Sequence, residues 1–291
     1  MKHASEALKT LNVGTTEIEY SEEGEGEPLL LVHAGVFADW FLPLAESETL
    51  RGFHVIRVRR AGYGRTPPPA PVSLNEHARH LALLLRSLHV GKAHVVGHSS
   101  GALICLQLAA DEPDLVQSLV LVEPAPLGPF QVPAFAEVGQ RFVGPAMAAF
   151  SDGDVPTATD RFMLGVCGEH YRDVLGRSLG EHAHADVLRE SPFFFKDEIP
   201  ACMQWQFGTA DAERVTMPVL VVEGAEGRRS GDLSRQVTER AMELFPAAEV
   251  VLIEDTNHML PLQNPEGLGR TVAGFARRYT RSMASVGPVS S

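Results

Sequence analysis

The chain has 291 residues, with 25 Lys or Arg and 37 Asp or Glu, and a formal net charge of -12 at pH 7. This acidic balance argues against nucleic acid and anionic membrane surfaces as partners, because both attract a basic face. The length is sufficient for one large α/β domain, with or without an insertion. The cysteines Cys105, Cys167 and Cys202 lie far apart and form no C-x-x-C pair, so neither a zinc site nor a disulfide framework is indicated.

The N-terminal sequence and the distribution of apolar residues bear on the compartment. Residues 1–6 contain no apolar segment typical of a secretory signal, and no apolar run is long enough to cross a bilayer. An odd number of isolated cysteines fits a reducing compartment. We therefore expect a cytoplasmic protein.

Apolar patterning predicts strands in the first sixty residues. These segments are 16–21, 29–32 and 53–59. Ser73 and Glu76 then form a capping box, and apolar residues at helical spacing after it predict a helix that Gly91 closes.

The next segment carries the strongest chemical signal. Gly97-His98-Ser99-Ser100-Gly101 follows a β-branched stretch and leads into an apolar helix that runs through Ala110. This is the context of a nucleophile elbow, in which Ser99 lies at the tip of a strand-to-helix turn. Gly97 and Gly101, two positions before and after Ser99, are consistent with this turn, because it has no space for side chains there. Ser99 is therefore the candidate nucleophile.

The second half changes character after Pro124. A strand at 119–122 is followed by prolines and mixed helical sequence, and strands return at 219–223 and 249–253, separated by a helix at 233–245. Asn264 caps a final helix. Alternating strands and helices predict a mostly parallel sheet covered by helices on both faces. We expect a core of residues 1–124 and 216–281, a helical lid inserted at 125–215, and a C-terminal tail at 282–291.

A serine nucleophile needs a base, and position selects one of the 12 histidines. His258 lies after the last strand and before the C-terminal helix, where the order nucleophile, acid, histidine puts it. His98 is adjacent to Ser99, and adjacent side chains on a tight turn point apart. We therefore expect His98 to pack at the elbow and His258 to be the base.

Three segments resemble the α/β-hydrolase superfamily. Leu31-Val32-His33-Ala34-Gly35 is similar to its oxyanion loop, Gly97-His98-Ser99-Ser100-Gly101 to its elbow, and Asn257-His258 to its histidine loop. The resemblance implies that fold, a Ser-His-acid triad, and an oxyanion hole. Its donors would be the backbone N–H of Ser100 and one from the loop around Gly35. Gly35 is favoured and Val36 is the alternative.

The acid departs from the commonest family pattern. Most members place it in a G-x-x-D segment after the strand that follows the lid, and here Gly224-Ala225-Glu226-Gly227 has glycine at that position. The chain instead resembles the subset that includes the zearalenone lactonases, with the acid after the strand following the elbow helix. That residue is Glu123, a lone glutamate ending a buried strand, which needs a partner. The alternatives are Glu226, Asp232 and Glu223.

Together these features predict a cofactor-free, metal-free serine hydrolase for a carboxylic ester or lactone. Val36, Phe194 and Trp205 are candidate substrate contacts, with the other aromatic residues of 193–195 beside them, and they favour an apolar or aromatic group. The same fold and triad also serve lyases, carbon–carbon hydrolases and cofactor-free oxygenases, so these alternatives stay open. A ligand-sensing receptor is a further alternative, and self-association is left open.

Overall fold

The computed structural model describes residues 8–65 and 72–280. Their strands form one sheet in the order β1-β2-β4-β3-β5-β6-β7-β8. At one edge β2 pairs antiparallel with both β1 and β4, and the remaining pairs are parallel. The strands are β1 Lys9–Val13, β2 Thr16–Glu23, β3 Glu27–Val32, β4 Phe53–Arg59, β5 Ala93–His98, β6 Val116–Val122, β7 Val219–Gly224 and β8 Glu249–Ile253. This is the mostly parallel α/β sheet that the sequence predicts.

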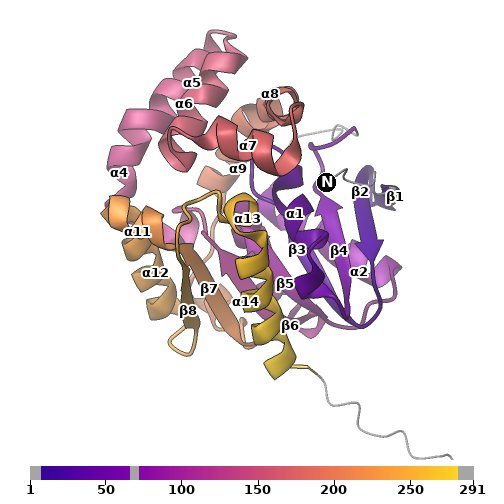
Figure 1. Cartoon of the computed structure of the whole chain (residues 1–291). Coiled ribbons are helices and arrows are strands. Elements are labelled where there is room, and N and C mark those ends of the chain that lie inside the picture. The colour runs from indigo at the N-terminus through magenta and orange to yellow at the C-terminus, as the bar shows by residue number, and fades with distance from the viewer. Residues whose placement is uncertain (1–7, 66–71, 281–291) are drawn as a thin grey trace, which may run out of the picture.

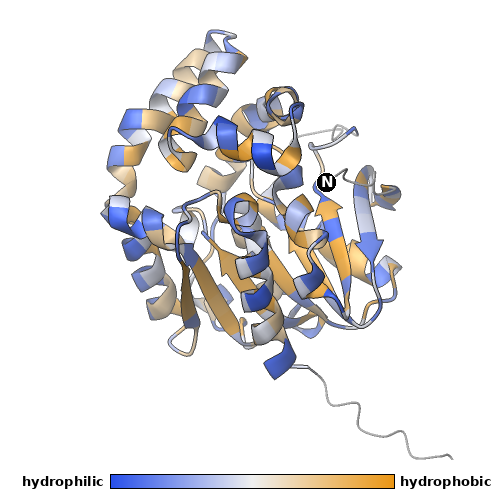
Figure 2. Cartoon of the chain, viewed as in Figure 1, coloured by the Kyte–Doolittle hydropathy of each residue, from blue (hydrophilic) through white to orange (hydrophobic). Residues whose placement is uncertain are grey.

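Helices cover both faces of the sheet because its central strands are apolar on both sides. On one face, α2 (Leu74–Ser87), α3 (Ser100–Asp111) and α12 (Asp232–Leu244) share a buried cluster with the sheet. On the other, α1 (Leu42–Ala45) and α14 (Pro265–Arg278) share a second cluster. Figure 2 shows the strands as a hydrophobic layer beneath helices whose outer faces are hydrophilic. No helix in the described ranges has the length and apolar character to span a bilayer.

Between β6 and β7 the described chain is helical, and we call residues 125–215 the helical insertion. Figure 1 shows it above the sheet, with α5 to α8 stacked at the top of the molecule. Its helices are α4 Phe135–Val138, α5 Gly144–Ser151, α6 Val155–Cys167, α7 Tyr171–Leu179, α8 Ala183–Phe193, α9 Ile199–Gln204 and α10 Thr209–Ala212, with π-helical turns at Gly139–Val143 and Phe194–Glu198. Much of it packs on the loop after β3 in a third buried cluster.

One local expectation comes out differently, at the end of a helix. The Ser73 cap is confirmed, since its hydroxyl accepts the Glu76 N–H at 3.1 Å, but α2 ends at Ser87 and not at Gly91. Its end is closed by His89 in the left-handed region (φ 56°). The expected tail at 282–291 lies outside the described residues. Short helices α11 (Ala225–Ser230) and α13 (Leu260–Gln263) complete the chain.

Candidate active site

Ser99 lies between β5 and α3, in a strained backbone conformation (φ 55°, ψ -119°). Its N–H donates to Val122 O at 3.0 Å, which ties the turn to the neighbouring strand. A Cβ on Gly97 would lie 2.5 Å from Gly101 O, and one on Gly101 would lie 2.4 Å from His33 O. Both glycines are therefore required by close backbone approach, and the turn has the shape of a nucleophile elbow.

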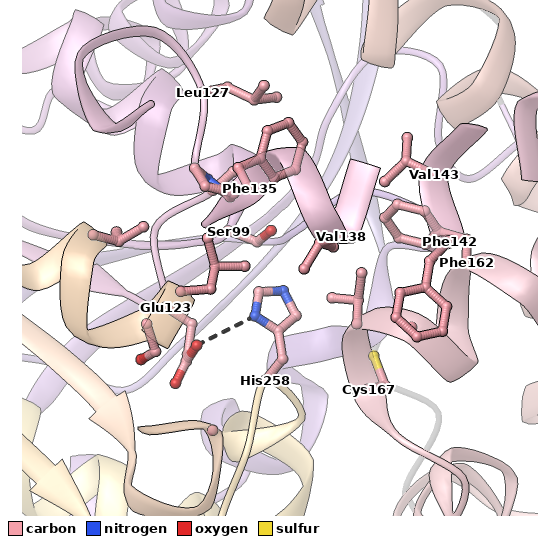
Figure 3. Close-up of a pocket in the computed structure, with 18 of the residues that line it drawn as sticks. Ser99, Glu123, Leu127, Phe135, Val138, Phe142, Val143, Phe162, Cys167 and His258 are labelled. Carbon is pink, nitrogen blue, oxygen red and sulfur yellow. Dashed lines mark hydrogen bonds and ion pairs between the residues drawn. The ribbon is translucent and has the colours of Figure 1, made fainter. Parts of the chain in front are cut away.

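His258 and Glu123 come together although 135 residues separate them. His258 Nδ1 lies 3.4 Å from Glu123 Oε2, which is at the long end of hydrogen-bonding distance (Figure 3). Glu123 Oε1 accepts the Gly224 N–H at 2.6 Å. Glu123 has φ 45°, an uncommon conformation for a glutamate, and it turns the chain away from the end of β6. Tertiary contacts thus hold the carboxylate beside the imidazole.

The other candidate acids are arranged differently. Glu226 and Asp232 are exposed, and Asp232 pairs with Arg235 at 3.0 Å. Glu223 is buried on β7, and burial together with the neighbouring Glu123 raises its pKa to about 7. A Cβ on Gly227 would lie 4.0 Å from Glu123 Oε1. The Glu123 carboxylate therefore lies beside Gly227, the position at which a G-x-x-D pattern would have its aspartate.

His98 packs at the elbow and also contacts the histidine loop, which sequence reasoning missed. It is fully buried, and desolvation lowers its pKa well below the ordinary value, so the ring is neutral. Nε2 lies 3.0 Å from the carbonyl oxygen of His258 and donates to it. The Trp40 ring meets His98 edge-on at 4.9 Å between centroids. His98 thus connects the turn that carries Ser99 to the backbone of His258.

The loop after β3 presents backbone amides to the same region. Ala34 O is bonded by His33 Nδ1 at 2.6 Å, and Gly35 O accepts Trp40 Nε1 at 2.8 Å. Because a carbonyl and the following N–H point opposite ways in a trans peptide, the amides of Gly35 and Val36 face away from these partners. Gly35 and Val36 line a cavity together with Ser99 and Ser100. Ser100 begins α3, so its N–H has no acceptor within the helix.

The cavity measures about 860 Å³ and reaches from these residues into the helical insertion. Figure 3 shows apolar side chains of the insertion around His258, with Phe135 and Val138 on one side and Phe142, Val143 and Phe162 on another. Cys167 also lines the cavity, but burial raises the pKa of its thiol, so it is a poor nucleophile. The site combines Ser99, Glu123 and His258 with a large chamber that the insertion lines with apolar side chains.

The charge of the cavity is unbalanced. Its acidic lining residues are Glu123, Glu137, Glu223 and Asp232. Arg141 is the one Arg or Lys among the described lining residues, and its guanidinium lies 5.1 Å from the centre of the Phe142 ring. Within the described ranges, no cluster of His, Cys, Asp and Glu is arranged to hold a metal ion.

Two of the three candidate substrate contacts line the cavity, and one does not. Val36 and Phe194 line the cavity, and the Phe194 ring lies against Gly35, where an added Cβ would come within 2.5 Å of it. Trp205 was expected to line the cavity, and this is wrong. Its indole is buried in the core against α3, where Nε1 donates to Gln107 Oε1 at 2.7 Å. A buried indole N–H needs an acceptor, and Gln107 supplies it away from the cavity.

Of the other two phenylalanines at 193–195, neither is part of the cavity lining that the structure describes. Phe193 packs edge-on against Tyr63, with 5.1 Å between ring centroids. Phe195 is buried in the third cluster, where it stacks on Phe150. An aromatic run in sequence therefore supplies one cavity residue and two packing residues, because successive helical positions face different neighbours.

Comparison with known proteins finds hydrolases of similar sequence. The chain is 26% identical over 276 residues to the 2-(acetamidomethylene)succinate hydrolase of Mesorhizobium japonicum, covering 92% of this chain and 94% of that protein. It is 32% identical over 117 residues to the (E)-2-((N-methylformamido)methylene)succinate hydrolase of Acinetobacter baylyi, a match that spans 39% of this chain and 44% of that protein.

A thermophilic esterase from Thermogutta terrifontis has a similar fold, with a TM-score of 0.75, 21% identity, and coverage of 94% of this chain and 100% of that one. The model of the Alpha/beta hydrolase family matches residues 29–271, which include the elbow, the oxyanion loop and the histidine loop. The chain therefore belongs to the alpha/beta hydrolase family.

Proposed function

We propose that this alpha/beta hydrolase is a cofactor-free serine hydrolase that cleaves carboxylic esters or lactones with an apolar or aromatic group. The observation that carries the proposal is the contact of His258 Nδ1 with Glu123 Oε2 in a cavity also lined by Ser99. A carboxylate on Nδ1 holds the imidazole so that Nε2 is free to accept a proton.

The reaction has two acyl-transfer steps. Ser99 Oγ attacks the carbonyl carbon while His258 Nε2 takes its proton, and the resulting oxyanion accepts hydrogen bonds from the amides of Ser100 and Gly35. His258 then gives the proton to the leaving alcohol, which departs and leaves an acyl-Ser99. Water attacks this ester with His258 again as the base, so the acid is released and Ser99 regains its proton.

Glu123 is proposed as the acid because of what surrounds it. The Gly224 N–H bonds one carboxylate oxygen and His258 the other. The absence of a carboxylate at Gly227 leaves space that the Glu123 side chain borders. This acid placement is the one that the zearalenone lactonase-like subset has, and it supports a lactone as an alternative to an open ester.

The cavity favours a neutral, apolar substrate. Phe142, Phe162 and Val143 make a wall without hydrogen-bonding groups. The two relatives named above act on succinate derivatives, which carry carboxylates. Among the described lining residues, four carboxyl groups face one basic side chain, Arg141, and this disfavours such anions by like-charge repulsion. A neutral aryl or alkyl ester, or a macrocyclic lactone, fits this lining better.

The test compares wild type with Ser99→Ala on a panel of neutral aryl esters and macrocyclic lactones, beside a fluorophosphonate labelling assay. Wild type should hydrolyse members of the panel and be labelled once per chain, and Ser99→Ala should lose about 10⁴-fold or more in kcat and all labelling. Labelling without turnover of any ester or lactone would favour lyase, carbon–carbon hydrolase or oxygenase chemistry. Activity that survives in Ser99→Ala would remove covalent serine catalysis from the account.

A further inference from the structure

Two buried glutamates of the helical insertion have no part in the proposed triad. Glu190 lies on α8 and Glu198 ends the π-helical turn that continues it, and both are at most 6% exposed. Buried carboxylates are rare unless they are paired. Glu190 bonds the loop of residues 33–39 directly, and Glu198 bonds Arg60, which in turn bonds that loop; the loop supplies the proposed oxyanion amides.

Glu198 reaches this loop through a buried arginine. Arg60 Nη2 donates to Glu198 Oε1 at 2.9 Å and to Ala34 O at 3.1 Å, so one guanidinium nitrogen bridges the insertion and the loop. The Tyr63 hydroxyl donates to the same carboxylate. Arg60 and Glu198 are buried. A charge pair that solvent does not screen thereby adds a second donor to the Ala34 carbonyl, beside the His33 ring that bonds it at 2.6 Å.

Glu190 holds the other end of the loop directly. Its Oε2 accepts the N–H of Ala38 at 2.8 Å, and its Oε1 accepts from Arg189 at 3.1 Å. Between the two ends, the Phe194 ring lies against Gly35. One continuous segment of the insertion, from α8 through the π-helical turn, therefore contacts the loop at both ends and at its middle.

The loop needs such support because of its backbone. Val36 has φ 75°, a region that a β-branched residue adopts only when its surroundings impose it. Fixing the Ala34 carbonyl also fixes the direction of the Gly35 N–H, since the two share one planar peptide. Oxyanion donors stabilise a transition state only if they are aimed before the charge develops.

We infer that Glu198, acting through Arg60, and Glu190, acting through the Ala38 amide, are positioning residues that aim the oxyanion amides. The inference rests on the proposed serine hydrolase function, and it assigns the helical insertion a role in catalysis beyond enclosing the substrate. The contacts act on the transition state, so their loss lowers kcat and leaves ground-state binding of the substrate nearly unchanged.

The test measures kcat, KM and inhibition by an aryl boronic acid, which forms a tetrahedral adduct with a serine, for Glu198→Gln and Glu190→Gln. Each variant should lower kcat about 10- to 100-fold, with KM within about twofold of wild type. Each should also weaken inhibition by the boronic acid by a factor similar to the loss in kcat. Two variants in the same insertion serve as controls and should match wild type. Asp160→Asn removes an ion pair with Arg172 away from the loop, and Glu181→Gln changes an exposed carboxylate.

Stability is separated from positioning by a double variant. Glu198→Gln alone leaves Arg60 as a buried unpaired charge and so lowers the melting temperature. Arg60→Met with Glu198→Gln removes both charges, which should restore much of the melting temperature but not kcat, because Ala34 O then keeps only the His33 donor and still lacks the one from Arg60. Rescue of kcat together with stability would overturn the inference, as would a rise in KM with unchanged kcat. Failure of the proposed function would look different in the same assay, as activity that survives in Ser99→Ala or as no turnover of any ester or lactone by wild type.

Discussion

At the scale of single residues, two carboxyl groups lie at the ends of neighbouring parallel strands, Glu123 directly after β6 and Glu223 near the end of β7. Val122 pairs with Val222 in the sheet, so Glu123 and Glu223 come next to each other at the edge where the strands end. Glu123 has the Gly224 amide and His258 as partners. Glu223 Oε2 accepts from Arg228 at 3.3 Å, and Glu223 Oε1 is buried without a hydrogen-bond partner in the described structure. The two side chains differ in partners more than in position.

Glu223 should make the stability of the fold depend on pH. Its pKa is raised from 4.5 to about 7, so the folded protein holds this proton more tightly than the unfolded chain does. Its favourable contribution is present in full below pH 4.5 and is lost as pH rises through 7. Glu223→Gln keeps the shape of the protonated side chain. At pH 4.5 this variant and wild type should therefore unfold at similar urea concentrations. At pH 8 it should be more stable than wild type by up to about 3 kcal/mol. If the free energy of unfolding differed between Glu223→Gln and wild type by the same amount at both pH values, this prediction would be wrong.

At the scale of elements, the pattern of apolar residues predicts the strands and helices whose periodicity is strong. The ranges 53–59 and 249–253 coincide with β4 and β8, and the helix at 233–245 matches α12 within one residue at each end. β1 was not anticipated, because Lys9–Val13 is short and partly exposed at the sheet edge, where apolar alternation is weak. The π-helical turn at Phe194–Glu198 also has no local signal, since it is imposed by packing of the insertion on the loop after β3.

The same reasoning explains which site residues could be predicted. Ser99 and His258 have local motifs, and Glu123 follows from one glutamate at the end of an apolar strand. The contacts of Glu198 and Glu190 with the loop cannot be found in this way, since they join segments more than 130 residues apart. Trp205 was misassigned because aromatic residues look alike in sequence whether they line a cavity or fill a core.

Helix α6 offers a test of the cavity wall. Phe162 lines the cavity and packs on Phe194, whereas Leu164 on the same helix is 39% exposed. Phe162→Ala enlarges the chamber and removes apolar contact area. It should lower kcat/KM about tenfold for short acyl esters and less for bulky ones. Leu164→Ala should leave the selectivity between acyl lengths unchanged. If Phe162→Ala and Leu164→Ala change the selectivity between acyl lengths equally, Phe162 does not contact the acyl group.

At the scale of the whole molecule, the net charge of -12 and the acidic lining of the cavity both disfavour negatively charged substrates. We expect a neutral aryl ester to be hydrolysed with a higher kcat/KM than the same ester carrying a carboxylate, by about tenfold at low salt. The difference should shrink as the Debye length falls from about 10 Å at 0.1 M salt to about 3 Å at 1 M. A preference for the carboxylated ester would instead indicate that Arg141 governs recognition.

The central claim is that Glu123 orients His258 for proton transfer with Ser99, and kcat of Glu123→Gln measures it most directly. The amide keeps the size of the side chain but removes the charge that stabilises the imidazolium, so kcat should fall about 10²- to 10⁴-fold. Glu223→Gln and Asp232→Asn, which change neighbouring carboxyls that do not contact His258, should stay within a few-fold of wild type. A nearly unchanged Glu123→Gln beside a strongly impaired Glu223→Gln or Asp232→Asn would contradict the account and move the acid to the segment after β7.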